Sequence, residues 1–547
     1  MGNTAIYPGG FGMAGTVIEQ ILECLTDKQN ILLSGGAGSG KTHTLIQTLN
    51  SVFKYSPTAS VACITYTNVA ANEIKERSPY SKLHVSTIHD FLWDIIKGYQ
   101  KNIKQTVLAL LEAEKLSRGT GIPYSGEDDI TGDSFAIVEY RSYRKIEKGI
   151  VSHDDVLKIA NYMFEKYPLL SKILCDKYDY IFIDEYQDTQ KLVVEIFLKH
   201  IKPKAKGVLC IGFFGDKMQS IYDTGVQDIQ AFVDSGDVKE IIKSDNYRCS
   251  IAVINLLNNI RSDIKQSPAK KLDDGSVGNK IGSAVFIHSR EEFDLEMFKH
   301  SKFVSGWDFD NPVQTKVLFL THRLIARRMG FEELLGSYGY TDNLIGNEPD
   351  RLASHLLKIT GILHYYEEKS YRNVIEDLQY RVKSISDKGR ISKLLNELLN
   401  NQDINIKTMI ERFDREKLIR IDDRLGEYAT NNKETYDKVM ALPFTQAMAY
   451  FNYYNNFSPY STQHGIKGAE FDNVLVVLDN GNWNNYNFKY YFEKTSEKER
   501  IISRTERIYY VCCSRTKDNF VVFYPSPTPQ IITQAEKLFG RENVYSM

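Results

Sequence analysis

Short apolar runs alternate with longer segments of helical hydrophobic period along most of the chain. The runs have the length of buried strands. They cover residues 61–65, 180–184, 208–215, 316–321, 473–479 and 520–524. Strands that alternate with helices are typical of parallel sheets, and the spread of these runs along the chain indicates two sheets. The pattern therefore predicts an α/β fold.

A glycine-rich segment, GGAGSGKT, follows a short apolar run at residues 31–33. It matches the phosphate-loop pattern G-x-x-x-x-G-K-[ST], in which glycines let backbone N–H groups face the phosphates. In this pattern Lys41 reaches the outer phosphates and the Thr42 hydroxyl binds Mg²⁺. A glycine-rich turn that caps a helix is the alternative. The residues expected to hold the nucleotide are Gly35, Gly36, Ala37, Gly38, Ser39, Gly40, Lys41, Thr42 and His43.

Two adjacent carboxylates end another apolar run in the stretch YIFIDEYQDT, residues 180–189. Like charges repel, so a bound cation or a proton to be moved is the natural reason for the pair. Asp184 at the strand end is suited to hold Mg²⁺ through its water shell. Glu185 is suited to orient and deprotonate an attacking water. An acidic turn facing solvent is the alternative, but together with the phosphate loop the pair predicts an NTP hydrolase that uses Mg²⁺.

Composition narrows the class of protein without naming a function. The chain of 547 residues is too long for one core, so about two to four domains are expected. The formal net charge is −2, so any nucleic-acid groove has to be local. Seven cysteines without CxxC pairing argue against a metal cluster or a disulfide framework. With no signal-like start and no membrane-length apolar stretch, we expect a cytoplasmic protein without a membrane partner.

Seven segments along the chain occur together in one order, and that order is informative. They are ITYTNVAANEI (64–74), STIHDF (86–91), IDEYQDT (183–189), GDKMQSIY (215–222), NYR (246–248), STQHGIKGAEFDNV (461–474) and YVCCSRT (510–516). With the phosphate loop, this series resembles the motifs of superfamily 1 helicases of the UvrD/Rep/PcrA type. The resemblance extends along nearly the whole chain.

The resemblance implies two RecA-like P-loop domains with parallel sheets, each carrying a mainly helical inserted subdomain. The first RecA-like domain is expected at 1–94 and 166–240, with its insert at 95–165. The second is expected at 241–344 and 443–547, with its insert at 345–442. ATP is then expected to bind between the two RecA-like domains.

The resemblance also assigns nucleotide contacts. Gln20 is expected to read the adenine, Tyr247 to stack on it, and Glu470 to meet the ribose. Gln219 is expected to sense the γ-phosphate, and Gln187 to couple the two halves of the site. Arg248 and Arg515 are expected to arrive from the second domain as arginine fingers, because the planar, permanently charged guanidinium matches phosphate oxygens. Without the resemblance, both arginines could equally be surface residues.

On the nucleic-acid side, aromatic rings for bases and polar donors for phosphates are needed. Tyr66 and Tyr222 are the expected stacking residues. The expected polar contacts are Thr65, Asn68, Thr87, His89 and His464, with Thr67 as a further donor; packing at strand–helix junctions is the alternative. The chain has Thr224 and Gly225 where the family has tryptophan and arginine. Strand binding is therefore expected to be weaker, or to use other aromatic residues.

Two regions stay open at this level. YRSYRKIEKG (140–149) interleaves aromatic and basic residues, which suits nucleic acid but suits a solvated helix face better. The aromatic and asparagine-rich stretch at 480–494 has no assigned role.

Three functional hypotheses follow. The leading one is an ATP-dependent motor that moves 3′ to 5′ on single-stranded DNA and separates partly duplex DNA. The second is a DNA-responsive ATPase subunit that regulates a partner, because small proteins of this layout resemble the helicase-like subunit of Gabija-type antiphage systems, which work beside an OLD-family nuclease. The third, a nucleotide or metabolite kinase, does not account for residues 461–474 or Arg515.

Overall fold

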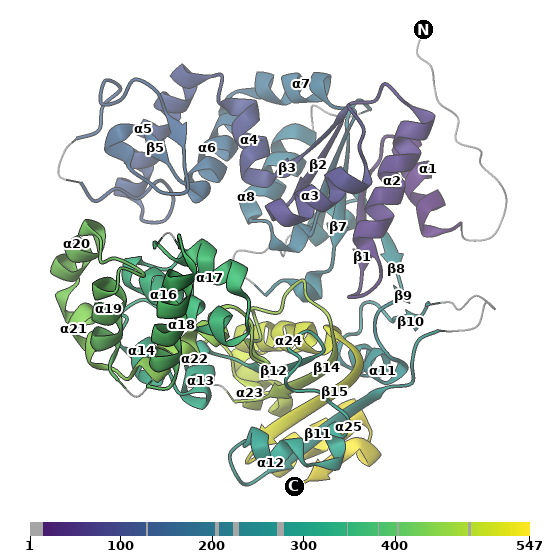
Figure 1. Cartoon of the computed structure of the whole chain (residues 1–547). Helices are drawn as coiled ribbons and strands as arrows, with labels where there is room; N and C mark the ends of the chain where they lie inside the picture. The colour runs from purple at the N-terminus through teal and green to yellow at the C-terminus, as the bar shows by residue number, and fades with distance from the viewer. Residues whose placement is uncertain are drawn as a thin grey trace. The chain divides into compact units, whose positions relative to one another are not determined.

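The structure is a computed structural model that describes residues 15–126, 129–202, 207–221, 229–270, 278–346, 348–380, 382–401, 404–479 and 483–547. The chain divides into two compact units, Met1–Ile281 and Gly282–Met547 (Figure 1), called here the first and second units. Each unit is built on one six-stranded sheet. The predicted α/β fold with two parallel sheets is confirmed.

The sheet of the first unit has the strand order β3-β2-β6-β7-β1-β8, and all its pairs are parallel. Its strands are β1 (Asn30–Gly35), β2 (Val61–Thr65), β3 (Leu83–Thr87), β6 (Tyr180–Asp184), β7 (Cys210–Gly215) and β8 (Val238–Lys243). Every residue of β1, β2, β6 and β7 is buried. This burial follows from helices on both faces, as parallel sheets require.

Alternate strand residues face two separate hydrophobic cores. Ile31 and Leu33 of β1 join one core with residues of α1, α2 and α3, whereas Leu32 joins the other with residues of α4 to α8. The two-residue period of a strand produces this division. The helices are α1 (Val17–Thr26), α2 (Lys41–Tyr55), α3 (Asn68–Arg77), α4 (Ile88–Ile96), α5 (Gln100–Leu116), α6 (His153–Lys166), α7 (Pro168–Lys177), α8 (Lys191–Val194) and α10 (Ile229–Asp234).

Residues 140–149 do not form the predicted helix face. They run from β4 (Glu139–Tyr140) through a single 3₁₀ turn at Ile146–Lys148 toward β5 (Ile150–Val151), and β4 pairs with β5. Arg144 donates from Nε and Nη2 to the two carboxylate oxygens of Asp155, both at 2.7 Å. Asp155 is fully buried in the first turn of α6, so the ion pair with Arg144 attaches the segment 140–149 to this helix.

The first unit continues past the boundary predicted at residue 240. Strand β9 (Asp245–Asn246), α11 (Ile251–Ile260) and β10 (Ser267–Pro268) all belong to it. The physical reason is a set of hydrogen bonds between this segment and the phosphate loop, described below. The division of the chain thus lies after Ile281 and differs from the sequence-based boundary.

The second unit has the strand order β13-β12-β14-β15-β11-β16, again with parallel pairs. Its strands are β11 (Ser283–Ser289), β12 (Thr315–Phe319), β13 (Tyr460–Thr462), β14 (Phe471–Val477), β15 (Thr516–Pro525) and β16 (Val544–Ser546). The helices near the sheet are α12 (Leu295–Lys299), α13 (His322–Met329), α14 (Glu332–Gly336), α15 (Asp342–Ile345), α22 (Phe444–Tyr454), α23 (Phe488–Glu493), α24 (Glu499–Ser514) and α25 (Pro529–Phe539).

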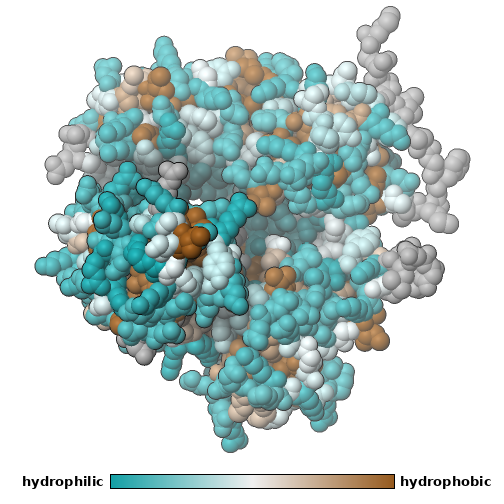
Figure 2. Space-filling model, viewed as in Figure 1, coloured by the Kyte–Doolittle hydropathy of each residue, from teal (hydrophilic) through white to brown (hydrophobic). Residues whose placement is uncertain are grey.

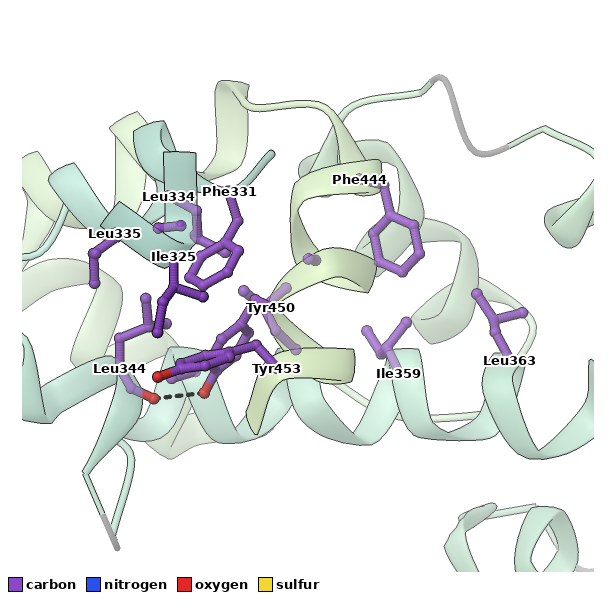
Figure 3. Packing of buried hydrophobic residues seen from close by; sticks show 14 of the residues in the cluster. Ile325, Phe331, Leu334, Leu335, Leu344, Ile359, Leu363, Phe444, Tyr450 and Tyr453 are labelled. Carbon is purple, nitrogen blue, oxygen red and sulfur yellow. Dashed lines mark hydrogen bonds between the residues drawn. The ribbon is translucent and has the colours of Figure 1, made fainter. Parts of the chain in front are cut away.

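A helical region is inserted between β12 and β13. It contains α16 (Arg351–Glu367), α17 (Tyr371–Asp377), α18 (Ile385–Leu399), α19 (Ile406–Arg415), α20 (Asp423–Asn431) and α21 (Lys433–Ala441). Its core is continuous with that of the sheet. Figure 3 shows Tyr450 within this core, where its hydroxyl donates to the carbonyl of Leu344 at 2.6 Å. A buried tyrosine hydroxyl needs such a partner.

Among the described residues, no helix combines the length and the apolar character needed to cross a membrane. The face seen in Figure 2 is mostly hydrophilic, with hydrophobic residues in small separate areas.

Candidate functional site

The phosphate loop connects β1 to α2 in the first unit. Gly38 and Gly40 have φ values of 73° and 76°, a region that favours glycine. A Cβ on Gly38 would lie 2.8 Å from Oδ1 of Asn246, so no side chain fits there. Lys41 is buried at the start of α2, and its Nζ donates to the carbonyl of Gly36 at 3.3 Å. The loop therefore has the closed, glycine-dependent form of a phosphate cradle at a helix N-terminus.

The acidic strand end faces this loop. Oγ1 of Thr42 donates to Oδ2 of Asp184 at 3.2 Å, and Asp184 is only 2% exposed. Burial and the neighbouring Glu185 raise the pKa of Asp184, while Lys41 and hydrogen bonds oppose the rise. A buried carboxylate beside a hydroxyl offers the hard oxygen ligands that Mg²⁺ prefers. The two residues predicted to hold the metal thus lie together and fit it.

Glu185 has an unusual backbone conformation, with φ of 50° for a residue that is not glycine. Nε2 of Gln187 donates to Oε2 of Glu185 at 2.5 Å. Oε1 of Gln187 accepts from the backbone N–H of Asp216 at 3.0 Å. Gly215 makes this approach possible, because a Cβ there would lie 2.2 Å from Oε1 of Gln187. Gln187 therefore connects the carboxyl ends of β6 and β7.

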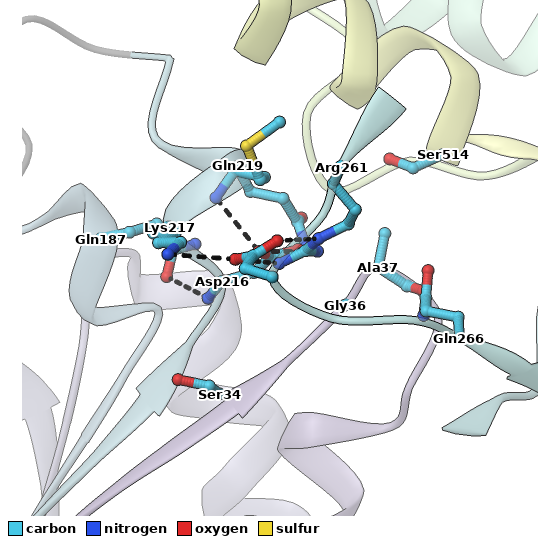
Figure 4. Close-up of polar contacts among 12 residues, drawn as sticks. Ser34, Gly36, Ala37, Gln187, Asp216, Lys217, Gln219, Arg261, Gln266 and Ser514 are labelled. Carbon is cyan, nitrogen blue, oxygen red and sulfur yellow. Dashed lines mark hydrogen bonds and ion pairs between the residues drawn. The ribbon is translucent and has the colours of Figure 1, made fainter. Parts of the chain in front are cut away.

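Gln219 follows β7 and is held by a buried charge network (Figure 4). Its Nε2 donates to Oδ2 of Asp216 at 3.0 Å, and Nη1 of Arg261 donates to the same oxygen at 3.1 Å. Arg261 also binds Asp263 through Nε at 2.8 Å and Nη2 at 3.0 Å. Burial alone would raise the pKa of Asp263, but Arg261 and Lys217 hold it well below its usual range. Sequence reasoning missed Arg261, since no motif contains it.

The NYR segment contacts the phosphate loop from within the first unit. Nδ2 of Asn246 donates to the carbonyl of Ala37 at 3.1 Å, and the backbone N–H of Tyr247 donates to the carbonyl of Gly38 at 2.8 Å. Nε2 of Gln266, another residue without a motif, donates to the carbonyl of Ala37 at 2.9 Å. Arg248 was expected from the second domain, and this expectation is corrected: it lies in the first unit because Asn246 and Tyr247 are bound to the loop.

Of the two residues expected at the adenine, Tyr247 lies against the same loop. The ring of Tyr247 approaches Gly40, with 3.8 Å between the ring and a Cβ built on that glycine, and Tyr247 is 48% exposed. Its hydroxyl donates to Asp245 at 3.1 Å. Gln20 lies on α1, where its Nε2 donates to the carbonyl of Gly15 at 2.7 Å. His43 is exposed on α2.

Glu470 and Arg515 lie together in the second unit. Arg515 ends α24 and is buried, whereas Glu470 is exposed just before β14. The backbone N–H of Phe471 donates to the carbonyl of Arg515 at 2.9 Å, which brings the two predicted residues to neighbouring strands. Nη2 of Arg515 donates to the hydroxyl of Ser514 at 3.2 Å.

Residues predicted to touch DNA gather around a cavity of about 510 Å³ in the first unit. The inserted region adds Tyr140, His153 and Asp154 to the lining, and the predicted residues in it are Tyr66, Thr67, Asn68, Thr87 and His89. Thr65 is buried instead, with its hydroxyl donating to the carbonyl of Thr67 at 2.9 Å. The predicted stacking residue Tyr222, together with Thr224 and Gly225, lies outside the described residues.

His464 lies in an aromatic cluster in the second unit. Its Nε2 is 2.7 Å from the hydroxyl oxygen of Tyr486, and its ring centroid is 5.5 Å from that of Trp483. The guanidinium of Arg504 lies 5.8 Å from the centroid of the Tyr486 ring. Trp483 and Tyr486 belong to the asparagine-rich stretch at 480–494, for which the sequence suggested no role. Its aromatic content was the only signal that could have connected it with His464.

Comparisons with known proteins agree with this geometry. A family model described as an AAA domain matches residues 19–224. The chain is 26% identical to the Gabija protein GajB of Bacillus cereus (strain HuB5-5), over 96% of this chain and 97% of that protein. It is 24% identical to the Gabija protein GajB of Bacillus cereus (strain VD045), over 88% and 94%. It is 25% identical to the ATP-dependent DNA helicase PcrA of Staphylococcus aureus (strain Mu50 / ATCC 700699), over 52% and 45%.

The chain is similar to superfamily 1 helicases of the UvrD/PcrA type, and the resemblance that its motifs predicted is confirmed. It is accordingly an ATP-hydrolysing enzyme of helicase type, and the prediction of a P-loop hydrolase is confirmed. As a UvrD/PcrA-like protein it uses ATP, and its phosphate loop is the segment that the geometry offers for it.

Proposed function

We propose that the chain couples ATP hydrolysis to movement along single-stranded DNA in the 3′ to 5′ direction. The observation that carries this proposal is the strand order β6-β7-β1. These three neighbours end in Asp184, Gly215 and the phosphate loop, so that the acids, Gln219 and Lys41 meet at one edge of one sheet. Ligands of open parallel sheets bind at this edge.

In this proposal the chain's own residues divide the chemistry between them. Lys41 binds the outer phosphates, and Thr42 and Asp184 hold Mg²⁺, which neutralises phosphate charge when bound. Glu185 accepts the proton of the attacking water, with Gln187 fixing its carboxylate. Gln219 contacts the γ-phosphate, and Arg248 and Arg515 stabilise charge on the transferred group. Gln20, Tyr247 and Glu470 bind the nucleoside.

One segment connects the two candidate sites. Residues 183–189 supply Glu185 and Gln187 to the nucleotide site, and Asp188 and Thr189 to the lining of the cavity beside Tyr66. A strand bound in the cavity is therefore within a few residues of the proposed catalytic base. This continuity supports ATP hydrolysis that responds to DNA. Trp483 beside His464 supplies a further aromatic surface, which compensates for the tryptophan missing at Thr224.

The inserted regions are assigned to strand and partner contacts. We place the first RecA-like domain at 1–94 with 166–281, and the second at 282–344 with 443–547, in keeping with the division after Ile281. The inserts at 95–165 and 345–442 extend from them. In the first, Tyr140, His153 and Asp154 reach the cavity, which supports a role in strand binding.

A second candidate function is an ATPase subunit that regulates a partner nuclease of the OLD family in an antiphage complex. The similarity to two Gabija GajB proteins favours it, because that similarity extends over 96% and 88% of this chain. The similarity to PcrA covers 52%. The two functions share the ATP site and differ in whether the chain separates strands alone.

The deciding experiment is steady-state ATP hydrolysis with and without single-stranded DNA. Lys41→Ala should lower turnover by about 10²–10³-fold or more, because it removes a charged contact to the outer phosphates. Lys54→Ala, an exposed lysine on the same helix α2, is the matched control and should keep wild-type turnover. Near-normal turnover of Lys41→Ala would refute the site.

The response of the wild type to DNA separates the two functions. Strong stimulation by DNA, followed by displacement of a paired strand, supports the motor. If DNA does not change the rate of hydrolysis until an OLD-family nuclease is added, the result supports the regulatory subunit.

A further inference from the structure

The cavity beside Tyr66 carries an unusual charge for a site on a DNA-binding protein. Its lining contains three aspartates, Asp90, Asp154 and Asp188, and none of the described residues that line it is a lysine or an arginine. Burial and the neighbouring His153 lower the pKa of His89 to about 4, so His89 carries no charge at neutral pH. A phosphate is repelled by this lining, whereas an uncharged nucleobase is not.

The size and the aromatic content of the cavity also suit a base. Its volume of about 510 Å³ lies within the range of about 300–1,000 Å³ found for small-molecule sites. Tyr66 borders it and is 43% exposed, which leaves ring surface for stacking. The rings of His89 and His153 meet edge to face at 5.1 Å, and those of His153 and Tyr140 at 5.2 Å.

The inserted region adds groups that can read the edge of a base. Asp154 is exposed in the first turn of α6, and its Oδ1 accepts from Nε2 of Gln190 at 3.1 Å. An ionised carboxylate only accepts hydrogen bonds, and its two oxygens have capacity for further donors. His153 is held by a hydrogen bond between its Nδ1 and the hydroxyl of Tyr140. Acceptors therefore dominate this side of the cavity.

We propose that the cavity holds one base of the bound strand and that Asp154 makes it prefer cytosine to thymine. The edge of cytosine carries the N4 amino donor, which the carboxylate accepts, whereas thymine presents the O4 acceptor, which the carboxylate repels. The proposal rests on the proposed function, because it requires a bound DNA strand. It assigns base selectivity to a residue of the inserted region.

The test compares the affinities of oligo(dC) and oligo(dT) of equal length for the full chain, measured by fluorescence anisotropy at pH 8 and one salt concentration. Wild type is expected to bind oligo(dC) about fivefold more tightly, the value of one net hydrogen bond. Asp154→Asn should reduce the ratio to less than twofold, because an amide accepts from cytosine and donates to thymine equally well. Asp133→Asn, an exposed carboxylate of the same region outside the cavity, should keep the wild-type ratio.

Each outcome decides the proposal. Equal wild-type affinities for the two oligonucleotides overturn it, and so does a ratio that Asp154→Asn leaves unchanged while its melting temperature stays at the wild-type value. In both cases strand binding itself remains, and the proposed function stands. Loss of all binding to both oligonucleotides in the wild type overturns the proposed function together with this inference.

Discussion

The nucleotide site and the cavity beside Tyr66 share residues 183–189, yet they are built in different ways. The nucleotide site is assembled from the carboxyl ends of neighbouring strands, β6, β7 and β1, with short polar links between them. The lining of the cavity includes Tyr140, His153 and Asp154, which come from the inserted region. The nucleotide site is therefore built from strand ends, whereas the inserted region contributes to the cavity.

The two sites also differ in their charges. In the nucleotide site, buried Asp184 lies beside Lys41 and Thr42, an arrangement for a phosphate and its cation. In the cavity, carboxylates face neutral histidine and tyrosine, an arrangement for an uncharged ligand. The difference teaches that the strand ends place charged groups suited to a phosphate, whereas the inserted region supplies the groups that we propose to select the base.

The largest effect is expected in the nucleotide site, where one substitution should greatly lower turnover and keep ATP binding. Glu185→Gln should keep ATP binding and lower turnover by about 10²–10⁴-fold, the contribution of a general base. The amide keeps the shape of the side chain beside Gln187 but accepts no proton. Turnover comes from steady-state hydrolysis, and binding from a fluorescent ATP analogue. If binding disappears as well, Glu185 is a structural residue of the strand end.

A second test concerns the buried charges behind Gln219. Arg261→Met should lower the free energy of unfolding by about 3–5 kcal/mol, because it leaves Asp216 buried without its arginine. Urea denaturation followed by circular dichroism measures the change. The matched control is Arg372→Met, which breaks an exposed pair with Glu376 and should cost less than about 0.5 kcal/mol. Equal effects of the two substitutions would mean that the network is not essential to the first unit.

The same contrast explains how much the sequence predicts. All six apolar runs correspond to central strands, among them β2, β6 and β14, because strands buried on both faces are continuously apolar. The edge strand β8 (Val238–Lys243) was not predicted, since exposed and half-buried residues interrupt its buried ones. Only a partner strand reveals such a segment as part of a sheet.

Some residues of the candidate site could be predicted from local sequence patterns, and others could not. Lys41, Thr42, Asp184 and Glu185 could be predicted because each follows a strand within a recognisable local pattern. Arg261 and Gln266 could not, because their contacts with Asp216 and Ala37 cross 45 and 229 residues of chain. The cavity likewise joins residues that are far apart in the sequence, because the inserted region lines it together with Tyr66.

A third test asks whether both aromatic surfaces bind the strand. Tyr66→Ala and Trp483→Ala should each weaken affinity for single-stranded DNA by about 1–3 kcal/mol, the value of one base stack. ATP hydrolysis in the absence of DNA should stay at the wild-type rate, since neither residue is among those assigned to the nucleotide. Tyr143→Ala, an exposed tyrosine outside the cavity, is the control. Unchanged affinity for one variant removes that surface from the strand path.

The smallest expected effect concerns the pH dependence of the cavity. His89 faces His153 and Asp154 of α6, Asp90 of its own helix, and Tyr140, and its pKa falls from 6.5 to about 4 chiefly because of burial. The fold therefore favours neutral His89. Its contribution to stability is present above pH 6.5 and is lost as the pH falls toward 4.

Relative to wild type, His89→Gln should remove about 1–2 kcal/mol of the destabilisation between pH 7.5 and pH 5, because glutamine does not titrate. Melting temperatures of both proteins across this range measure the difference. Other partly buried histidines, such as His322 and His355, also have pKa values lowered by desolvation, and they destabilise both proteins alike. Parallel pH profiles would show that His89 is already protonated or solvated in the cavity, and the charge contrast between the two sites would then be smaller than the geometry indicates.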